Sequence, residues 1–248
     1  MIGIVGFGRF GRLTTRYLAE DFEVAVYDSG DNASAIEKSG AAAVSLEQAC
    51  GEEILILSVP ISVFGATLEK VRPLLRKDAL VVDVCSVKLY PVELMQRLLP
   101  AGVSILATHP MFGPDSAADS LKGRKIVLCR ERIDEARYLE IKAYLDGKGL
   151  FTIEATPDEH DRQISVSLAL THFIGRSLSE FGAQPLGIDT EGYQRLLHVL
   201  EVVENDTWQL FVDMHRYNPY TRRHRREMIE ALHRLNSKLE KSMEESDA

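Results

Sequence analysis

The first part of the chain alternates between short apolar runs and segments with helical spacing. In residues 63–75, for example, Phe64, Leu68, Val71 and Leu75 recur on one face of a predicted helix. Strands that alternate with helices in this way are typical of a parallel sheet with helices packed against it. The apolar runs of strand length are residues 1–5, 22–27, 54–57, 80–84, 105–107, 124–129 and 150–154.

No strand pattern follows Pro157. Asp161, Ser165, Leu168 and His172 have the spacing that places them on one face of a helix, and a further helix is expected after Gly192. The pattern therefore predicts an α/β domain over residues 1–155, followed by an all-α domain over residues 156–248.

A glycine motif ends the first apolar run and precedes a helical segment. Gly6 would permit a tight turn, Gly8 would let the backbone approach a pyrophosphate, and Gly11 would let the helix pack closely on the strand. Because strand and helix lie on the correct sides of the motif, we predict a doubly wound Rossmann-type dinucleotide-binding domain rather than a plain turn. The predicted cofactor-binding residues of this turn are Gly6, Phe7, Gly8, Arg9, Phe10 and Gly11.

Asp28 follows the second predicted strand and lies close to the spacing at which an acid bonds the adenosine ribose. A carboxylate there repels a 2′-phosphate and favours NAD over NADP, although Arg9 and Arg12 keep NADP possible. An Asp after a strand can also serve only as a turn residue. A third group of candidate cofactor contacts ends the strand over residues 54–57 and comprises Ser58, Val59 and Pro60.

Composition excludes several kinds of partner. A net charge of −8, from 29 basic and 37 acidic residues, argues against nucleic acid. Three widely spaced cysteines suggest neither a disulfide framework nor a zinc site, as expected in a reducing cytoplasm. The strand that begins at Met1 leaves no room for a signal peptide, and no apolar run has membrane-spanning length. We therefore expect a cytoplasmic protein with a small-molecule substrate.

Ser86 and His109 are the candidates for chemistry, because each follows one of two adjacent predicted strands. A neutral imidazole could accept a proton from a substrate hydroxyl while hydride leaves the same carbon, and a hydroxyl could orient that ring or a nicotinamide. The alternatives are a histidine that only bonds a backbone carbonyl and a serine that only caps a helix. Spacing alone does not decide between these readings.

The chain resembles the prephenate/arogenate dehydrogenase family of tyrosine biosynthesis. The resemblance rests on the motifs GFGRFG, VDVCSVK around Ser86, ATHPMFGP around His109, DEHDR, LTHFIGR, GYQRLL and YNPY. It implies oxidative decarboxylation of a cyclohexadienol without a metal, with His109 as the catalytic histidine and Ser86 bridging histidine, substrate and nicotinamide. It also implies that the helical domain binds substrate and forms a homodimer.

Three further residues are substrate contacts by the same resemblance. Cys129 stands where members that prefer arogenate carry an acid, so its neutral side chain suggests prephenate, with arogenate as the alternative. His172 matches the family histidine over the substrate pocket, although LALTH departs from the SHLPH of many bacterial members. Arg195 matches a carboxylate-binding arginine that the plant-like branch often lacks. Alternatively, Cys129 could be only a core residue, His172 only a packing residue and Arg195 only a solvent-facing residue.

Two other classes of protein share such a fold. A non-catalytic nucleotide sensor would need neither Ser86 nor His109. A β-hydroxyacid dehydrogenase would need a catalytic lysine in the second half, and no lysine lies between Lys148 and Lys238. The tail after Tyr220 is a short basic run followed by Met228, Ile229, Leu232, Leu235 and Leu239 at helical spacing, which suggests a helix packed on a partner subunit.

Overall fold

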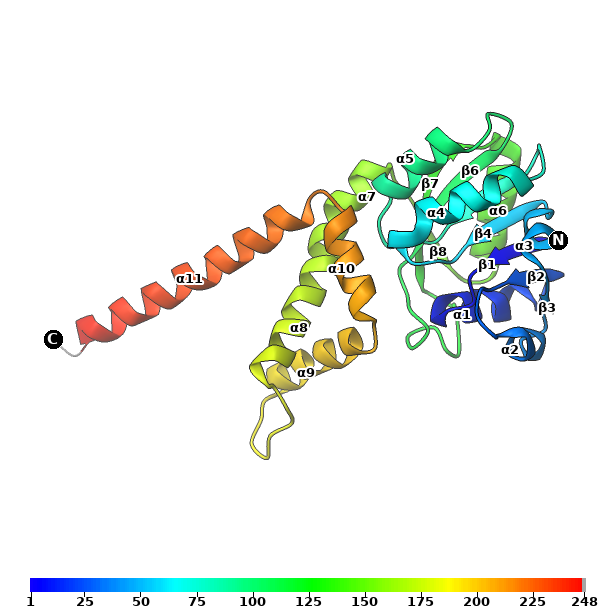
Figure 1. The fold of residues 1–248 in the computed structure, drawn as a ribbon. Coiled ribbons are helices and arrows are strands. Elements are labelled where there is room, and N and C mark those ends of the chain that lie inside the picture. Colours follow the sequence, from blue (N-terminus) through cyan, green and yellow to red (C-terminus); the bar gives the residue numbers. More distant parts are fainter. Residues whose placement is uncertain (247–248) are drawn as a thin grey trace. The chain divides into compact units, whose positions relative to one another are not determined.

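The computed structural model describes residues 1–246, which divide after His160 into two compact units, residues 1–160 and 161–246. The first unit is an eight-stranded sheet with the strand order β3-β2-β1-β4-β5-β6-β7-β8 (Figure 1). Its strands are β1 (Ile2–Val5), β2 (Val24–Tyr27), β3 (Ala42–Ala43), β4 (Ile54–Leu57), β5 (Leu80–Asp83), β6 (Ser104–Pro110), β7 (Lys125–Arg132) and β8 (Phe151–Glu154).

All neighbouring strands from β3 to β6 are parallel, and β7 pairs antiparallel with β6 before β8 pairs parallel with β7. The strand order reverses at β1, which lies between β2 and β4. Ligands of open α/β sheets bind beyond the carboxyl ends of the strands at such a reversal. The doubly wound fold predicted from the sequence is thus confirmed.

Helices cover both faces of the sheet because right-handed crossovers in opposite directions lead to opposite faces. The helix α1 (Arg9–Leu18) connects β1 to β2, and α2 (Ala33–Lys38) connects β2 to β3, so both belong to crossovers in one direction along the sheet. The crossovers in the other direction contain α3 (Leu46–Cys50), α4 (Ile61–Val71), η1 (Arg72–Leu74) and α5 (Leu89–Leu98), and α6 (Glu135–Gly147) connects β7 to β8.

Among its described residues the second unit contains helices and the loops that connect them, and no strand. Its elements are the end of α7 (Pro157–Ile164), the π-helical segment η2 (Ser165–Leu170), α8 (Thr171–Phe181), α9 (Glu191–Glu204), α10 (Trp208–Tyr217) and α11 (Thr221–Ser246). The π-helical segment widens the turn, so that Ala169 rather than Leu168 joins Asp161, Ser165 and His172 among the buried side chains. Among the described residues, no helix combines the length and apolar character needed to cross a membrane.

One strand of the site is longer than the sequence pattern predicted. We expected a strand over residues 105–107 that ends before His109, but β6 continues to Pro110. The extension exists because β7 pairs antiparallel with it, with Val127 opposite His109 and Ile126 opposite Pro110. His109 therefore belongs to the rigid sheet and not to a loop after it.

The glycine turn between β1 and α1 is constrained by close backbone contacts. Gly6 has φ +104°, and a Cβ atom there would lie 2.2 Å from the carbonyl oxygen of Ser58. A Cβ atom on Gly11 would lie 2.2 Å from the carbonyl oxygen of Gly6, whereas one on Gly8 would meet no atom within 4 Å. The first and last glycines are thus required by packing, and Gly8 leaves open space.

This difference yields a test of the packing. We expect Gly11→Ala to lower the free energy of unfolding by about 3 kcal/mol, the upper range for overpacking, because the added methyl group meets rigid backbone. Gly8→Ala should cost no more than about 1 kcal/mol, the usual cost of alanine at a helix N-cap. Urea unfolding of both variants measures the two values, and equal losses would contradict the assignment.

Candidate active site

The start of α1 is free to receive an anion. Gly8 is the N-cap residue, no side chain caps the helix, and its first turn contains no acidic residue. The backbone N–H groups of such a helix start attract negative ligands such as phosphate. Together with the open space at Gly8, this geometry fits the pyrophosphate of a dinucleotide.

Phe7 and Arg9, two further residues of the glycine turn, differ in their surroundings. The Phe7 side chain is buried in the core, so only its backbone faces the turn, and the Arg12 guanidinium lies 4.5 Å from its ring centroid. Arg9 is exposed and forms an ion pair of 2.7 Å with Asp115. A cofactor contact of Arg9, as predicted from the sequence, would therefore have to compete with the carboxylate of Asp115.

Asp28 lies at the carboxyl end of β2 and holds the glycine turn in place. One carboxylate oxygen accepts a 2.7 Å hydrogen bond from the N–H of Phe7, and the other accepts from Gly30 N–H and from the Asn32 amide. Burial alone would raise the pKa of Asp28, but these hydrogen bonds and the charge of Arg12 lower it overall. The carboxylate is thus ionised at neutral pH and placed beside the turn.

Ser58, Val59 and Pro60 follow β4 at the same sheet edge. Ser58 N–H donates to the carbonyl of Val5, and Ser58 also borders Gly6 and Gly11. Pro60 is the N-cap of α4 and is exposed. The structure therefore brings this segment beside the glycine turn, as the parallel strands β1 and β4 require.

His109 points from β6 into a buried setting beside a second histidine. Its Nδ1 atom lies 2.8 Å from Nε2 of His160, and the two rings meet edge to face with centroids 5.0 Å apart. Burial, followed by the neighbouring His160 and Lys88, holds the pKa of His109 well below its ordinary value near 6.5. The imidazole is therefore neutral at neutral pH, which is the form that can accept a proton.

A fully buried ion pair connects the end of β5, just before Ser86, with the end of β6, where His109 lies. The ammonium group of Lys88 contacts a carboxylate oxygen of Asp83 and also donates to the carbonyl of Thr108. The Thr108 hydroxyl donates to the carbonyl of Asp83 at 2.7 Å. This network connects the end of β5 to the residue before His109. Burial, opposed by Lys88, raises the pKa of Asp83.

Ser86 lies between the two members of that ion pair in the sequence. Its Oγ atom is buried and has no hydrogen-bond partner among the described residues. Buried hydroxyl groups in native structures are almost always hydrogen-bonded, so an unsatisfied one suggests a site for a partner from outside the chain. The position fits a serine that contacts a nicotinamide or a substrate.

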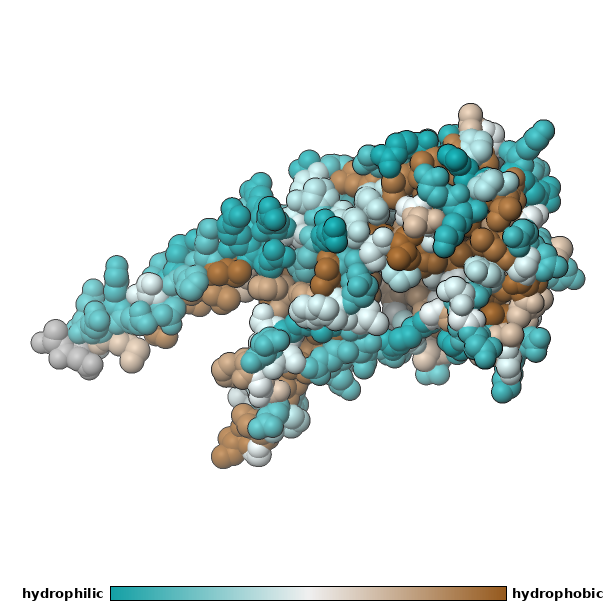
Figure 2. All heavy atoms as spheres, in the orientation of Figure 1, coloured by the Kyte–Doolittle hydropathy of each residue, from teal (hydrophilic) through white to brown (hydrophobic). Residues whose placement is uncertain are grey.

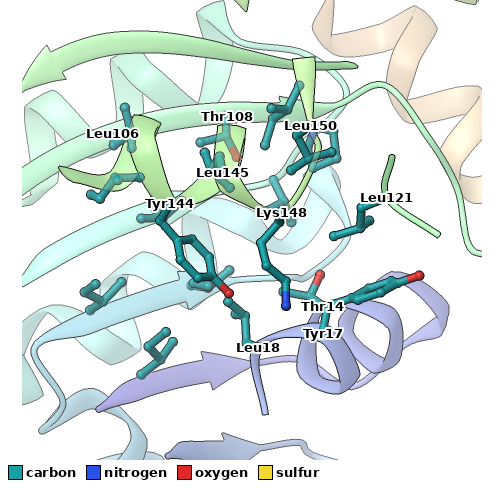
Figure 3. Close-up of a pocket in the computed structure, with 18 of the residues that line it drawn as sticks. Thr14, Tyr17, Leu18, Leu106, Thr108, Leu121, Tyr144, Leu145, Lys148 and Leu150 are labelled. Atoms are coloured by element: carbon teal, nitrogen blue, oxygen red, sulfur yellow. The ribbon is translucent and has the colours of Figure 1, made fainter. Parts of the chain in front are cut away.

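A cavity of about 340 Å³ lies on the other face of the sheet (Figure 3). Thr108 and Pro110 line it, and because side chains alternate along a strand, His109 between them faces away. Tyr144 of α6 and Lys148, the C-cap residue of that helix, lie across from Tyr17 of α1. The walls are almost entirely apolar, and neither Ser86 nor His109 lines them, so this cavity is separate from the candidate active site.

The connection from β6 to β7, residues 111–124, packs against α1. Phe112 lies 6.2 Å from Phe10, measured between ring centroids. The Tyr17 hydroxyl donates to the carbonyl of Ala117 at 2.9 Å, and the Arg16 guanidinium donates to the carbonyl of Ala118. Phe10 is thus engaged with this connection and with the cavity wall.

The structure corrects the position expected for Cys129. We expected it at the end of a strand, but β7 continues to Arg132 because its register with β6 extends that far. Cys129 lies inside the strand opposite Ala107, and its side chain is fully buried. Its predicted role as a substrate contact stays a prediction.

His172 and Arg195 belong to the second unit and differ in their surroundings. His172 is buried, its Nε2 atom lies 3.7 Å from a carboxylate oxygen of Asp206, and its Nδ1 atom has no partner among the described residues. Burial and Arg176 lower the pKa of His172 to about 4. Arg195 is 78% exposed and paired with Glu191 one turn earlier on α9. Their predicted roles as substrate contacts stay predictions.

Sequence reasoning missed three members of the site, Asp83, Lys88 and His160. Both Lys88 and His160 lie in motifs that carried the family resemblance, VDVCSVK and DEHDR, and this was the available signal. Over residues 1–246, His, Cys, Asp and Glu side chains form no cluster of three or more that could hold a metal ion.

Comparison with known proteins agrees with these features. A family described as the nucleotide-binding domain of prephenate dehydrogenase matches residues 19–150, more than half of the chain. Another, described as the TYRAAT1-like C-terminal domain, matches residues 177–248. The structure of prephenate dehydrogenase from Aquifex aeolicus, in complex with hydroxyphenyl propionate and NAD+, aligns with a TM-score of 0.77 at 20% identity. That alignment covers 98% of this chain and 91% of the other, and it shows the likeness of the fold.

Two curated relatives come from Arabidopsis thaliana. The chain is 33% identical to arogenate dehydrogenase 1, chloroplastic, over 88% of its own length and 36% of the relative. It is 30% identical to arogenate dehydrogenase 2, chloroplastic, over 88% of its own length and 64% of the relative. The chain thus spans less than two thirds of each. With its glycine turn and its neutral histidine at the sheet edge, the chain belongs to the prephenate/arogenate dehydrogenase family.

Proposed function

We propose that this chain catalyses the oxidative decarboxylation of a cyclohexadienol, prephenate or arogenate, with a nicotinamide dinucleotide as oxidant. The observation that carries the proposal is the neutral, buried His109, held in β6 at the same sheet edge as the uncapped start of α1. A base and a dinucleotide turn on one edge are the two parts that such a reaction needs.

His109 acts as the base in this proposal. Its Nδ1 atom faces His160, so Nε2 is the ring nitrogen that can accept the proton of the substrate hydroxyl. Removal of this proton raises the electron density on the oxygen and lets the carbinol carbon release a hydride. Loss of the ring carboxyl group as carbon dioxide then leaves an aromatic product, and aromatisation makes the reaction irreversible.

The residues of the first unit fit a dinucleotide. The N–H groups at the start of α1 and the open space at Gly8 would hold the pyrophosphate, and Asp28 would accept hydrogen bonds from the adenosine ribose. Ser86, with its unsatisfied Oγ atom, would contact the nicotinamide and the substrate hydroxyl. When bound, the nicotinamide supplies the hydride acceptor. We propose NAD rather than NADP, because the ionised Asp28 repels a 2′-phosphate.

One observation favours arogenate over prephenate as the substrate. Two relatives at 30% identity or more are named arogenate dehydrogenases, which supports arogenate. Prephenate was the substrate suggested by the neutral Cys129, and that residue is fully buried. We therefore propose arogenate as the better substrate and prephenate as the second candidate.

The second unit is proposed to provide the interface of a homodimer. On α11 the apolar side chains Ile229, Leu232, Leu235, Leu239 and Met243 are 39–65% exposed, and Figure 2 shows hydrophobic residues along one side of this helix. A helix of that length with an uncovered apolar stripe is typical of one that packs against a partner. The repeat of these positions suits pairing with the same helix of a second copy.

The cysteines support a reducing location. Cys50, Cys85 and Cys129 are all buried, and none of the three forms a disulfide bond. Proteins of oxidising compartments more often use their cysteines in disulfides. We therefore propose a reducing compartment such as the cytoplasm.

The first test concerns the base. We expect the wild-type protein to reduce NAD with arogenate faster than with prephenate, followed by absorbance of the reduced nicotinamide. His109→Asn should lower kcat by about 10²–10⁴-fold, the usual contribution of a general base. His198→Asn is the matched control, since that side chain is 75% exposed on α9. A near-normal rate for His109→Asn would remove this histidine from the mechanism.

The second test concerns cofactor choice. Asp28→Asn removes the charge and keeps one acceptor oxygen, which can serve either the N–H of Phe7 or the N–H of Gly30 but not both, because the two groups bond to different oxygens of Asp28. We expect the ratio of kcat/KM for NADP to that for NAD to rise by about tenfold or more, which corresponds to about 1.4 kcal/mol of removed repulsion. An unchanged ratio, with both cofactors still turned over, would refute the ribose assignment.

The third test concerns the dimer. A double change, Leu235→Glu with Leu239→Glu, places two charges in the apolar stripe, so we expect the mass measured by light scattering to fall from that of a dimer to that of a monomer. Ser237→Glu adds a charge on the opposite side of the helix and should leave the mass unchanged. A wild-type protein that is monomeric at micromolar concentration would overturn the proposal.

A further inference from the structure

We propose that His160 is the positioning residue of the catalytic base: its Nε2 atom accepts a hydrogen bond from Nδ1–H of His109 and so leaves the lone pair of His109 on Nε2. The inference rests on the proposed function for its catalytic meaning, but the hydrogen bond itself can be examined in the resting protein. The distance of 2.8 Å between the two nitrogen atoms carries it.

Only one arrangement of protons across this contact is compatible with a base. A neutral imidazole has one N–H donor and one acceptor nitrogen. If His109 donates through Nδ1, its Nε2 atom is an acceptor and can take a proton. If His109 instead accepted at Nδ1, its Nε2 atom would carry a hydrogen and could not act as a base.

The surroundings make the contact strong and its loss costly. Both histidines are buried, His109 with 6% and His160 with 3% of the residue exposed. Water cannot readily replace a lost partner at such depth, and a buried N–H without an acceptor costs free energy. The His109 Nδ1 atom therefore depends on His160 for its hydrogen bond.

The two residues are also held by different elements. His109 is fixed in β6 by its pairing with β7, and His160 lies in α7, 51 residues later in the sequence. The backbone N–H of His160 donates to Thr156, and Thr156 and Glu159 form a capping arrangement at the start of α7. The proposed acceptor, His160, thus lies on a separate helix with a capped N-terminus, which is the arrangement expected of a group that orients a base.

Charges around the pair favour the neutral base before the reaction. Lys88, in the segment after β5, bears a positive charge close enough to lower the pKa of His109, and Asp83 of β5 balances that charge. His160 of α7 is the other titratable group that lowers the pKa of His109. Once His109 has taken the proton, His160 is the group that accepts the hydrogen bond from the charged ring.

The test compares His160→Leu with His160→Gln. Leucine removes the acceptor, whereas the side-chain oxygen of glutamine can take the place of Nε2. We expect His160→Leu to lower kcat by about 10–100-fold, consistent with loss of part of a general base contribution, while the dissociation constant for NAD changes less than twofold. His160→Gln should recover most of the rate. The exposed His198, changed to Leu and to Gln, is the control for either substitution.

A second readout does not depend on turnover. In ¹⁵N-labelled protein, the imidazole nitrogen signals of His109, identified by their absence in His109→Asn, report which nitrogen carries hydrogen. We expect Nδ1–H in the wild type and in His160→Gln, with a change in population in His160→Leu. The pH profile of kcat/KM should shift its acidic limb in His160→Leu and not in His160→Gln.

The outcomes separate the two proposals. A wild type that turns over neither substrate but shows Nδ1–H on His109 would defeat the proposed function and leave the positioning role supported. A wild type with hydrogen on Nε2 of His109 would overturn the positioning role, even if His160→Leu fails to fold. Equal kcat values for His160→Leu and the wild type, or equal losses in His160→Leu and His160→Gln, would also overturn it.

Discussion

The candidate active site depends on one buried ion pair, between Asp83 at the end of β5 and Lys88 in the segment that follows. Removing two charges from water is costly, and the cost is offset only where the geometry also satisfies their hydrogen bonds. Here Asp83 also accepts the N–H of Cys85, and Lys88 also donates to the carbonyl of Thr108. The pair therefore defines the path of the chain between the two strand ends, including the position of Ser86.

From this constraint the chemistry of the site follows in two steps. Fixing the carbonyl of Thr108 fixes the end of β6, and His109 is the next residue. Burial then keeps the imidazole neutral, so that it can accept a proton without a neighbouring carboxylate. The parallel strands β1 and β4 to β6 all end at this edge, which places the glycine turn and His109 at the same edge of the sheet.

Much of the first unit could be predicted from the sequence because its signals are local. The apolar runs gave the principal strands, and Gly6, Gly11 and Asp28 have spacings that follow from short-range packing. The extent of β6 could not be predicted, because it depends on pairing with β7 across residues 111–124. The partner of His109 lies 51 residues away, and Lys88 looks like an ordinary surface lysine until the fold buries it. Such long-range contacts leave no periodic pattern in the chain.

Because β7 runs antiparallel to β6, the connection between the two strands starts and ends at the same edge of the sheet. A parallel crossover would have carried the chain to the opposite edge of the sheet, but the antiparallel step keeps residues 111–124 at the edge where His109 lies. This connection bonds to α1 through Asp115, Ala117 and Ala118. These contacts join the connection, which begins at the strand of His109, to the helix that begins at the glycine turn. A change in the length or sequence of this connection would therefore affect the positions of the glycine turn and of His109 together.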